Sequence, residues 1–170
     1  MNELPDLEIF IGMAALGLTV TGFSGLISVL GRRASGNWSS AERFQLEQLI
    51  ELSLAVTFAS FIPLLVSTAV SGDRVLPLAT GTVALFHLII MGRGMYKTVT
   101  RGASALELPR GGVPMTFIGG TMLITGGLLA SFGIIGGQAF LLVANILWLL
   151  MIGLVHFVGL LMNAGQRGGS

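Results

Sequence analysis

The feature that most constrains this chain is a series of long apolar stretches with almost no charge. No charged residue occurs from Ile9 to Leu30, and the stretch from Gly111 to Gln166 contains no Asp, Glu, Lys or Arg. A soluble domain usually has about 25% charged residues, whereas this chain has 10% and a mean hydropathy of +0.87. Such a surface is not stable in water, so we expect lipid to be its main solvent.

The apolar stretches divide into five predicted membrane crossings. At roughly 20 residues per crossing, the 170 residues leave room for five spans and no separate soluble domain. A helix is expected to begin near Ser40, because Ser39-Ser-Ala-Glu42 has the pattern of a capping box. The glycine-rich run 131–137 divides the last stretch. The predicted fold is an all-α bundle of five transmembrane helices in one domain, 1–170, with spans at about 9–30, 52–70, 75–92, 114–132 and 138–162.

The basic residues predict the orientation of this bundle. Of the nine Lys and Arg residues, only Arg74 falls on one side of the membrane. The other eight fall on the opposite side: Arg32, Arg33, Arg43, Arg93, Lys97, Arg101, Arg110 and Arg167. The positive-inside rule then places the N-terminus outside and the C-terminus in the cytoplasm. Together with the compact loops, this predicts a multi-pass protein of a bacterial-type plasma (inner) membrane.

Several kinds of chemistry are not expected. The chain has no cysteine, so it has no disulfide, thiol nucleophile or cysteine-ligated metal. Neither a phosphate-binding loop nor a His-Glu-x-x-His motif occurs. We therefore expect no enzymatic activity, no metal and no resident cofactor. The net charge of +1, without a dense basic run, indicates that nucleic acid is not a partner.

Small residues form two stripes on the first span. One consists of Gly12, Ala15, Thr19 and Gly22, and the other of Ala14, Gly17, Thr21, Ser24 and Ser28. At about 100° per residue, the two stripes lie on nearly opposite sides of the helix. Small faces let helices approach closely in lipid, and Gly126 and Gly127 predict the same on the fourth span. The stripes predict a homo-oligomer, with either plain packing on both sides or a water-filled path along Thr21, Ser24 and Ser28.

Three ionisable residues are expected inside the membrane, where each is a candidate for function. Glu51, His87 and His156 lie eight, six and eleven residues from Arg43, Arg93 and Arg167. At 1.5 Å per residue, all three fall roughly 9–16 Å inside the cytoplasmic boundary. Ser24 falls at a similar depth, and Asn145 lies nearer the middle on the face of His156.

Two interpretations of this polar layer stay open. It is either a site that binds a cation or titrates with protons, or a set of interhelical hydrogen bonds with Glu51 reaching the interface. Two histidines on different helices also allow bis-imidazole haem ligation. The leading hypothesis is an oligomeric channel or small transporter for ions or a small solute. The alternative is a non-catalytic scaffold or accessory subunit of a larger membrane complex.

Overall fold

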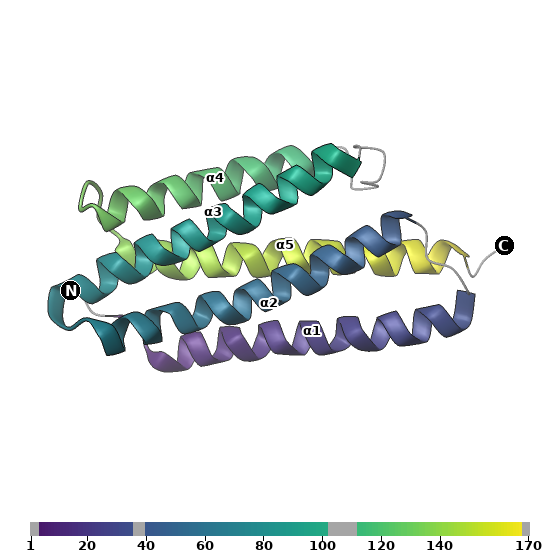
Figure 1. The fold of residues 1–170 in the computed structure, drawn as a ribbon, viewed down its shortest axis with the longest axis horizontal. Coiled ribbons are helices and arrows are strands. Elements are labelled where there is room, and N and C mark those ends of the chain that lie inside the picture. The colour runs from purple at the N-terminus through teal and green to yellow at the C-terminus, as the bar shows by residue number, and fades with distance from the viewer. Residues whose placement is uncertain (1–3, 36–39, 102–111, 168–170) are drawn as a thin grey trace.

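The computed structural model describes residues 4–35, 40–101 and 112–167, and the regular structure in these ranges is entirely helical. The elements are α1 (Leu7–Ser35), α2 (Ser40–Ala69), the short 3₁₀ helix η1 (Gly72–Arg74), α3 (Val75–Arg101), α4 (Gly112–Ser131) and α5 (Gln138–Arg167) (Figure 1). The all-α prediction is confirmed. The predicted helix start near Ser40 is confirmed as well, while Ser39 of the capping box lies outside the described residues.

The five long helices alternate in direction along one bundle axis (Figure 1). α2, α3 and α5 pack against one another at the centre, α1 lies along the outer side of α2, and α4 packs on α3 and α5. The C-terminal ends of α1, α3 and α5 lie at the same end of the bundle, which we call the C-terminal end. The apolar core joins four helices through Phe10, Met13, Leu52, Ala55, Val56, Ala59, Leu76, Ala79, Val83, Leu142, Ile146 and Leu149.

Four helices are long and apolar enough to cross a bilayer. The candidate spans are Leu7–Ile27, Glu42–Ala69, Gly72–Thr100 and Gln138–Leu161, while the apolar part of α4, Thr116–Ser131, is shorter. Large apolar side chains such as Phe58, Leu65, Met122 and Phe140 are exposed on the outer faces. Lipid tails solvate apolar side chains as well as a protein interior does, so helices in lipid can keep apolar residues on their outer faces. The chain is a multi-pass membrane protein associated with the bilayer.

The turn between α4 and α5 follows from its glycines. α4 ends at Ser131, α5 begins at Gln138, and Gly133 and Gly137 have φ angles of 73° and 81°. Only glycine adopts such positive angles without steric cost, so the helix stops here although the sequence stays apolar. The predicted division of the last apolar stretch at 131–137 is confirmed.

Candidate functional site

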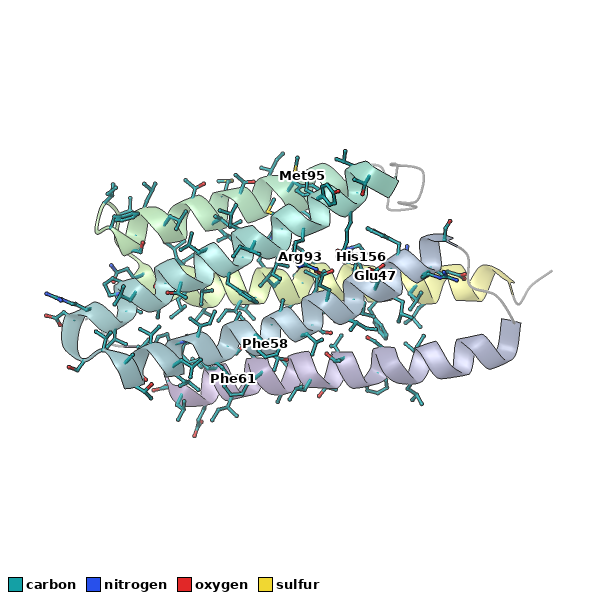
Figure 2. All side chains as sticks on the ribbon, in the orientation of Figure 1. Glu47, Phe58, Phe61, Arg93, Met95 and His156 are labelled. Atoms are coloured by element: carbon teal, nitrogen blue, oxygen red, sulfur yellow. The ribbon has the colours of Figure 1, made fainter. Side chains whose placement is uncertain are left out.

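Four helices, α2 to α5, line a partly open cavity of about 80 Å³. Figure 2 labels His156, one of its lining residues, in the half of the bundle nearer the C-terminal end. The polar lining residues are Gln48, His87, Thr98, Thr116 and His156. The remaining wall consists of Phe44, Leu52, Ile90, Met91, Gly94, Phe117, Leu149 and Ile152. The cavity is thus a mostly apolar chamber with a few inward polar groups, a composition common in ligand sites.

Helical periodicity brings these residues to one place. On α2 the lining residues Phe44, Gln48 and Leu52 recur every four residues, so they share one face. The lining residues of α3 and α5 follow the same three- or four-residue spacing, from His87 to Thr98 and from Leu149 to His156. Three amphipathic faces therefore meet at this point.

His87 is held in place by Asn145. The two side chains meet at 2.8 Å between Nδ1 of His87 and Oδ1 of Asn145, and neither is exposed. The amide nitrogen of Asn145 donates to the carbonyl oxygens of Leu141 at 2.8 Å and Leu123 at 3.0 Å. Asn145 therefore links α3, α4 and α5 and fixes the orientation of the imidazole ring.

Three buried polar atoms at the cavity have no hydrogen-bond partner within the described part of the chain. They are Nε2 of His87, Nε2 of Gln48 and Nδ1 of His156. The three side chains are 0%, 6% and 7% exposed, respectively. The ring of His156 packs edge-on against Phe44, with centroids 6.4 Å apart. Because buried polar groups are normally paired, three unpaired atoms around one cavity call for a ligand or for bound water.

Glu51 lies beside this cavity and not in its lining. Its carboxylate accepts from Nε of Arg93 at 3.1 Å and from Nζ of Lys97. Lys97 also lies 3.4 Å from Glu47. Figure 2 labels Arg93 on α3 and Glu47 on α2. Two carboxylates and two cations thus form a neutral cluster between α2 and α3. This pairing favours the interpretation that Glu51 reaches the membrane interface over the interpretation that it binds a free cation.

The second stripe of α1 faces α2. Oγ1 of Thr21 lies 2.8 Å from Oγ of Ser53, and the buried Ser24 donates to the carbonyl of Val20 at 2.7 Å. Gly17 lies so close to α2 that an added Cβ would approach Oγ1 of Thr57 to 2.5 Å. The hydroxyls of Thr21 and Ser24 are thus engaged within one chain. Ser28 lies in α1, and pore lining by this stripe remains a prediction.

The other predicted packing glycines divide into two groups. A Cβ on Gly127 would lie 3.0 Å from Cβ of Ala84, and one on Gly126 would lie 3.2 Å from Leu141, so α4 packs closely on α3 and α5 here. Gly12 and Gly22 have no neighbour within 4 Å of an added Cβ. Their stripe faces outward from the single chain, so its role in packing remains a prediction about a partner.

The described residues do not favour a bound metal or haem. Within residues 4–35, 40–101 and 112–167, no group of three His, Cys, Asp or Glu side chains converges on a metal-sized position. The two histidines line one cavity, but its volume of about 80 Å³ is roughly half that of a cavity that holds benzene. A porphyrin is several times larger than benzene, so the haem alternative does not fit this geometry.

Three polar residues of the site were missing from the sequence expectations: Gln48, Thr98 and Thr116. Gln48 lies between Arg43 and Glu51, close to the expected helix start at Ser40. Its spacing of four from Phe44 and Leu52 is the signal that would have placed it on the inward face. The pairing of Asn145 with His87 was also missed, because the sequence placed Asn145 only relative to His156 on its own helix.

Comparisons with protein-family models, curated proteins and solved structures found no match. Chemically, the site offers side chains that can form hydrogen bonds in a mostly apolar surrounding.

Proposed function

We propose that this protein is a small membrane channel or transporter whose selective site is the cavity formed by α2 to α5. The observation that carries the proposal is the set of buried polar atoms of Gln48, His87 and His156 without partners among the described residues, on side chains that line a cavity of about 80 Å³. Polar atoms without partners in the interior of a membrane bundle are costly, which makes them candidates for a site of solute passage. Glu51 pairs with Arg93 and Lys97 next to this site.

The proposed topology has five crossings, with the N-terminus outside and the C-terminus in the cytoplasm. In support, α4 has 20 residues, which at 1.5 Å per residue is about 30 Å, the thickness of a bilayer core. The alternating directions of the helices bring Arg43, Arg93 and Lys97 toward one end of the bundle and Arg74 to the other. The site would then lie in the cytoplasmic half of the membrane, and the membrane would be of the bacterial plasma type.

Flux through purified protein in liposomes tests the proposal directly. Efflux of several cations, anions and small neutral solutes would be followed for the wild type and for His87→Phe and Gln48→Leu. We expect selective flux in the wild type and its loss in both variants, because each removes a polar group from the cavity. The matched control is Thr19→Val, whose exposed hydroxyl bonds only within α1, to the carbonyl of Ala15.

Cysteine labelling tests the route of the solute. The chain has no native cysteine, so Thr98→Cys and Ser24→Cys each introduce a single thiol. A path through the cavity predicts that the thiol at 98 reacts with a small water-soluble reagent and that the thiol at 24 does not. The opposite pattern would move the path to α1, and a lack of reaction at 98 would contradict the proposal.

A second candidate function is an accessory subunit of a larger membrane complex. The observation in its favour is the outward stripe of α1, on which Gly12, Ala15, Thr19 and Gly22 are exposed. Small residues on a lipid-facing helix allow another helix to approach closely, either from a second copy or from a different subunit. Folded protein that conducts no solute under any condition, yet copurifies with other membrane proteins, would favour this function.

A further inference from the structure

Asn145 determines which ring nitrogen of His87 carries the hydrogen. The amide nitrogen of Asn145 lies within hydrogen-bond distance of two carbonyl oxygens, those of Leu141 and Leu123. Carbonyls only accept, so the NH₂ group must face them and Oδ1 must face His87. Because Oδ1 only accepts as well, Nδ1 of His87, 2.8 Å away, carries the hydrogen and donates it.

The other ring nitrogen, Nε2, is therefore left as an acceptor, on a ring that belongs to the lining of the cavity. Among the described residues, those that line the cavity carry no formal charge, since the polar ones are Gln48, Thr98, Thr116 and the two histidines. Without a carboxylate in this lining, nothing balances an imidazolium, so the ring is neutral. A neutral ring protonated at Nδ1 has a lone pair on Nε2. That atom is buried and has no partner among the described residues.

The same lack of charge selects against ions as ligands. The nearest acidic group of the cluster between α2 and α3, Glu51, already binds Arg93 and Lys97. A bare cation or anion in the cavity would lose its hydration without gaining a counter-charge, which is strongly unfavourable. The cavity therefore fits a neutral molecule.

Gln48 supplies the complementary group. Its Nε2 is a donor without a partner within the described residues, and its side chain lines the same cavity. The cavity thus presents one acceptor and one donor, with Nδ1 of His156 as a third polar position. The volume of about 80 Å³ is roughly half that of a cavity that holds the six carbons of benzene, which corresponds to three or four heavy atoms.

We infer that the cavity binds a neutral solute of three or four heavy atoms that donates a hydrogen bond to Nε2 of His87 and accepts one from Gln48. Small primary amides have this chemistry. The inference rests on the proposed function for the passage of the solute across the membrane, and on the cavity alone for its recognition.

Nitrogen-15 NMR of the reconstituted protein tests the inference. Labelled histidine gives signals from two rings, since the chain has two histidines, and His87→Phe identifies those of His87. The probes are acetamide and acetone, which have similar shape and four heavy atoms each, but only acetamide has N–H donors. We expect a protonated Nδ1 and an unprotonated Nε2 in His87, and a saturable shift of Nε2 with acetamide and not with acetone.

Two variants add a second measurement. Gln48→Leu removes the donor and should weaken acetamide binding by about two- to tenfold, the usual effect of one hydrogen bond. Asn145→Leu removes the partner of Nδ1 and should give a mixture of tautomers. A hydrogen on Nε2 in the wild type, an equal shift with acetone, or an absent shift with acetamide would each overturn the inference, the last one indicating that the cavity holds only water.

This readout is independent of transport. Saturable acetamide binding by protein that conducts no solute would overturn the proposed function and leave the inference standing. Flux of ions without an acetamide-dependent shift at His87 would overturn the inference and leave the proposed function standing.

Discussion

Two buried polar regions of this bundle meet α2 from opposite sides, and they differ in whether their polar atoms are paired. Between α1 and α2, Thr21 reaches Ser53 and Thr57 donates to backbone carbonyls, with Gly17 packed so tightly that a side chain has no room. Between α2 and the helices α3 to α5, buried nitrogens of Gln48, His87 and His156 have no hydrogen-bond partner among the described residues, and their side chains line one cavity. The first region holds helices together, and the second leaves a site.

Polar residues inside a membrane protein can therefore hold helices together or line a site. Hydroxyls of Thr and Ser bond to the carbonyl one turn back, so they can be buried without a ligand. Amides and imidazoles have more donors and acceptors than a neighbouring helix can satisfy. A cavity lined by the second group is therefore the better indicator of a site.

The largest expected effect comes from overfilling the paired region. Gly17→Val places atoms within 2.5 Å of Thr57 and 2.7 Å of the Ser53 carbonyl, so α1 and α2 must separate. We expect a loss of about 1–3 kcal/mol in the free energy of unfolding, measured by reversible unfolding in mixed micelles. Gly12→Val is the control, because its side chain meets no atom within 4 Å in the single chain. A similar loss for Gly12→Val would show that another helix covers that face.

An effect of the same order, without the separation of helices that Gly17→Val forces, is expected from unpairing the site. Asn145→Leu leaves Nδ1 of His87 buried without its acceptor, which costs about 1–3 kcal/mol without steric overlap, since the two side chains are similar in size. The same micelle unfolding measures the loss, and the control is Thr121→Val, whose exposed hydroxyl donates to the carbonyl of Phe117 within α4. An unchanged free energy of unfolding would mean that water replaces the lost partner and that the cavity is wet.

Breaking the charge cluster should have a smaller effect. Glu51→Gln removes the negative partner of Arg93, while Lys97 keeps Glu47 at 3.4 Å. Partly exposed ion pairs contribute about 1 kcal/mol or less, so we expect a small loss in stability and unchanged acetamide binding by NMR. Loss of that binding, or an altered ion selectivity in liposomes, would place the selective site at Glu51 and not in the cavity.

The smallest expected effect is the coupling of Thr21 to Ser53. A double-mutant cycle with Thr21→Val and Ser53→Ala should give about 0.6 kcal/mol, the average for interhelical hydrogen bonds in a bilayer. Each hydroxyl keeps an acceptor within its own helix, the carbonyls of Gly17 and Ile50, so neither single variant leaves a buried donor. Coupling above about 2 kcal/mol would exceed the bilayer range and contradict the description of this contact as ordinary packing.

Much of the fold could be predicted because the forces that set it are local. The apolar stretches, the glycine break at 131–137 and the amphipathic starts of helices are visible in short windows, and the structure has helices at those places. Counting residues placed His87 and His156 at a similar level, and in the structure both line one cavity.

What could not be predicted depends on the rotation of helices about their axes. A residue count gives depth but not direction, so Ser24 and His87 were expected at one level although Ser24 faces α2 and His87 faces the cavity. The pairing of Glu51 with Arg93 and Lys97 is also a relation between helices 42 and 46 residues apart. Neither relation can be inferred from the sequence of a single helix.

The charge cluster between α2 and α3 has a consequence for how the chain enters the membrane. α2 alone would bring two unbalanced carboxylates, Glu47 and Glu51, to the edge of the lipid, and α3 alone would bring the cations of Arg93 and Lys97. Joined by the short η1 segment, the two helices cancel these charges. The helical hairpin from α2 to α3 is therefore the unit that partitions into the bilayer at least cost, because the cations of α3 neutralise the carboxylates of α2.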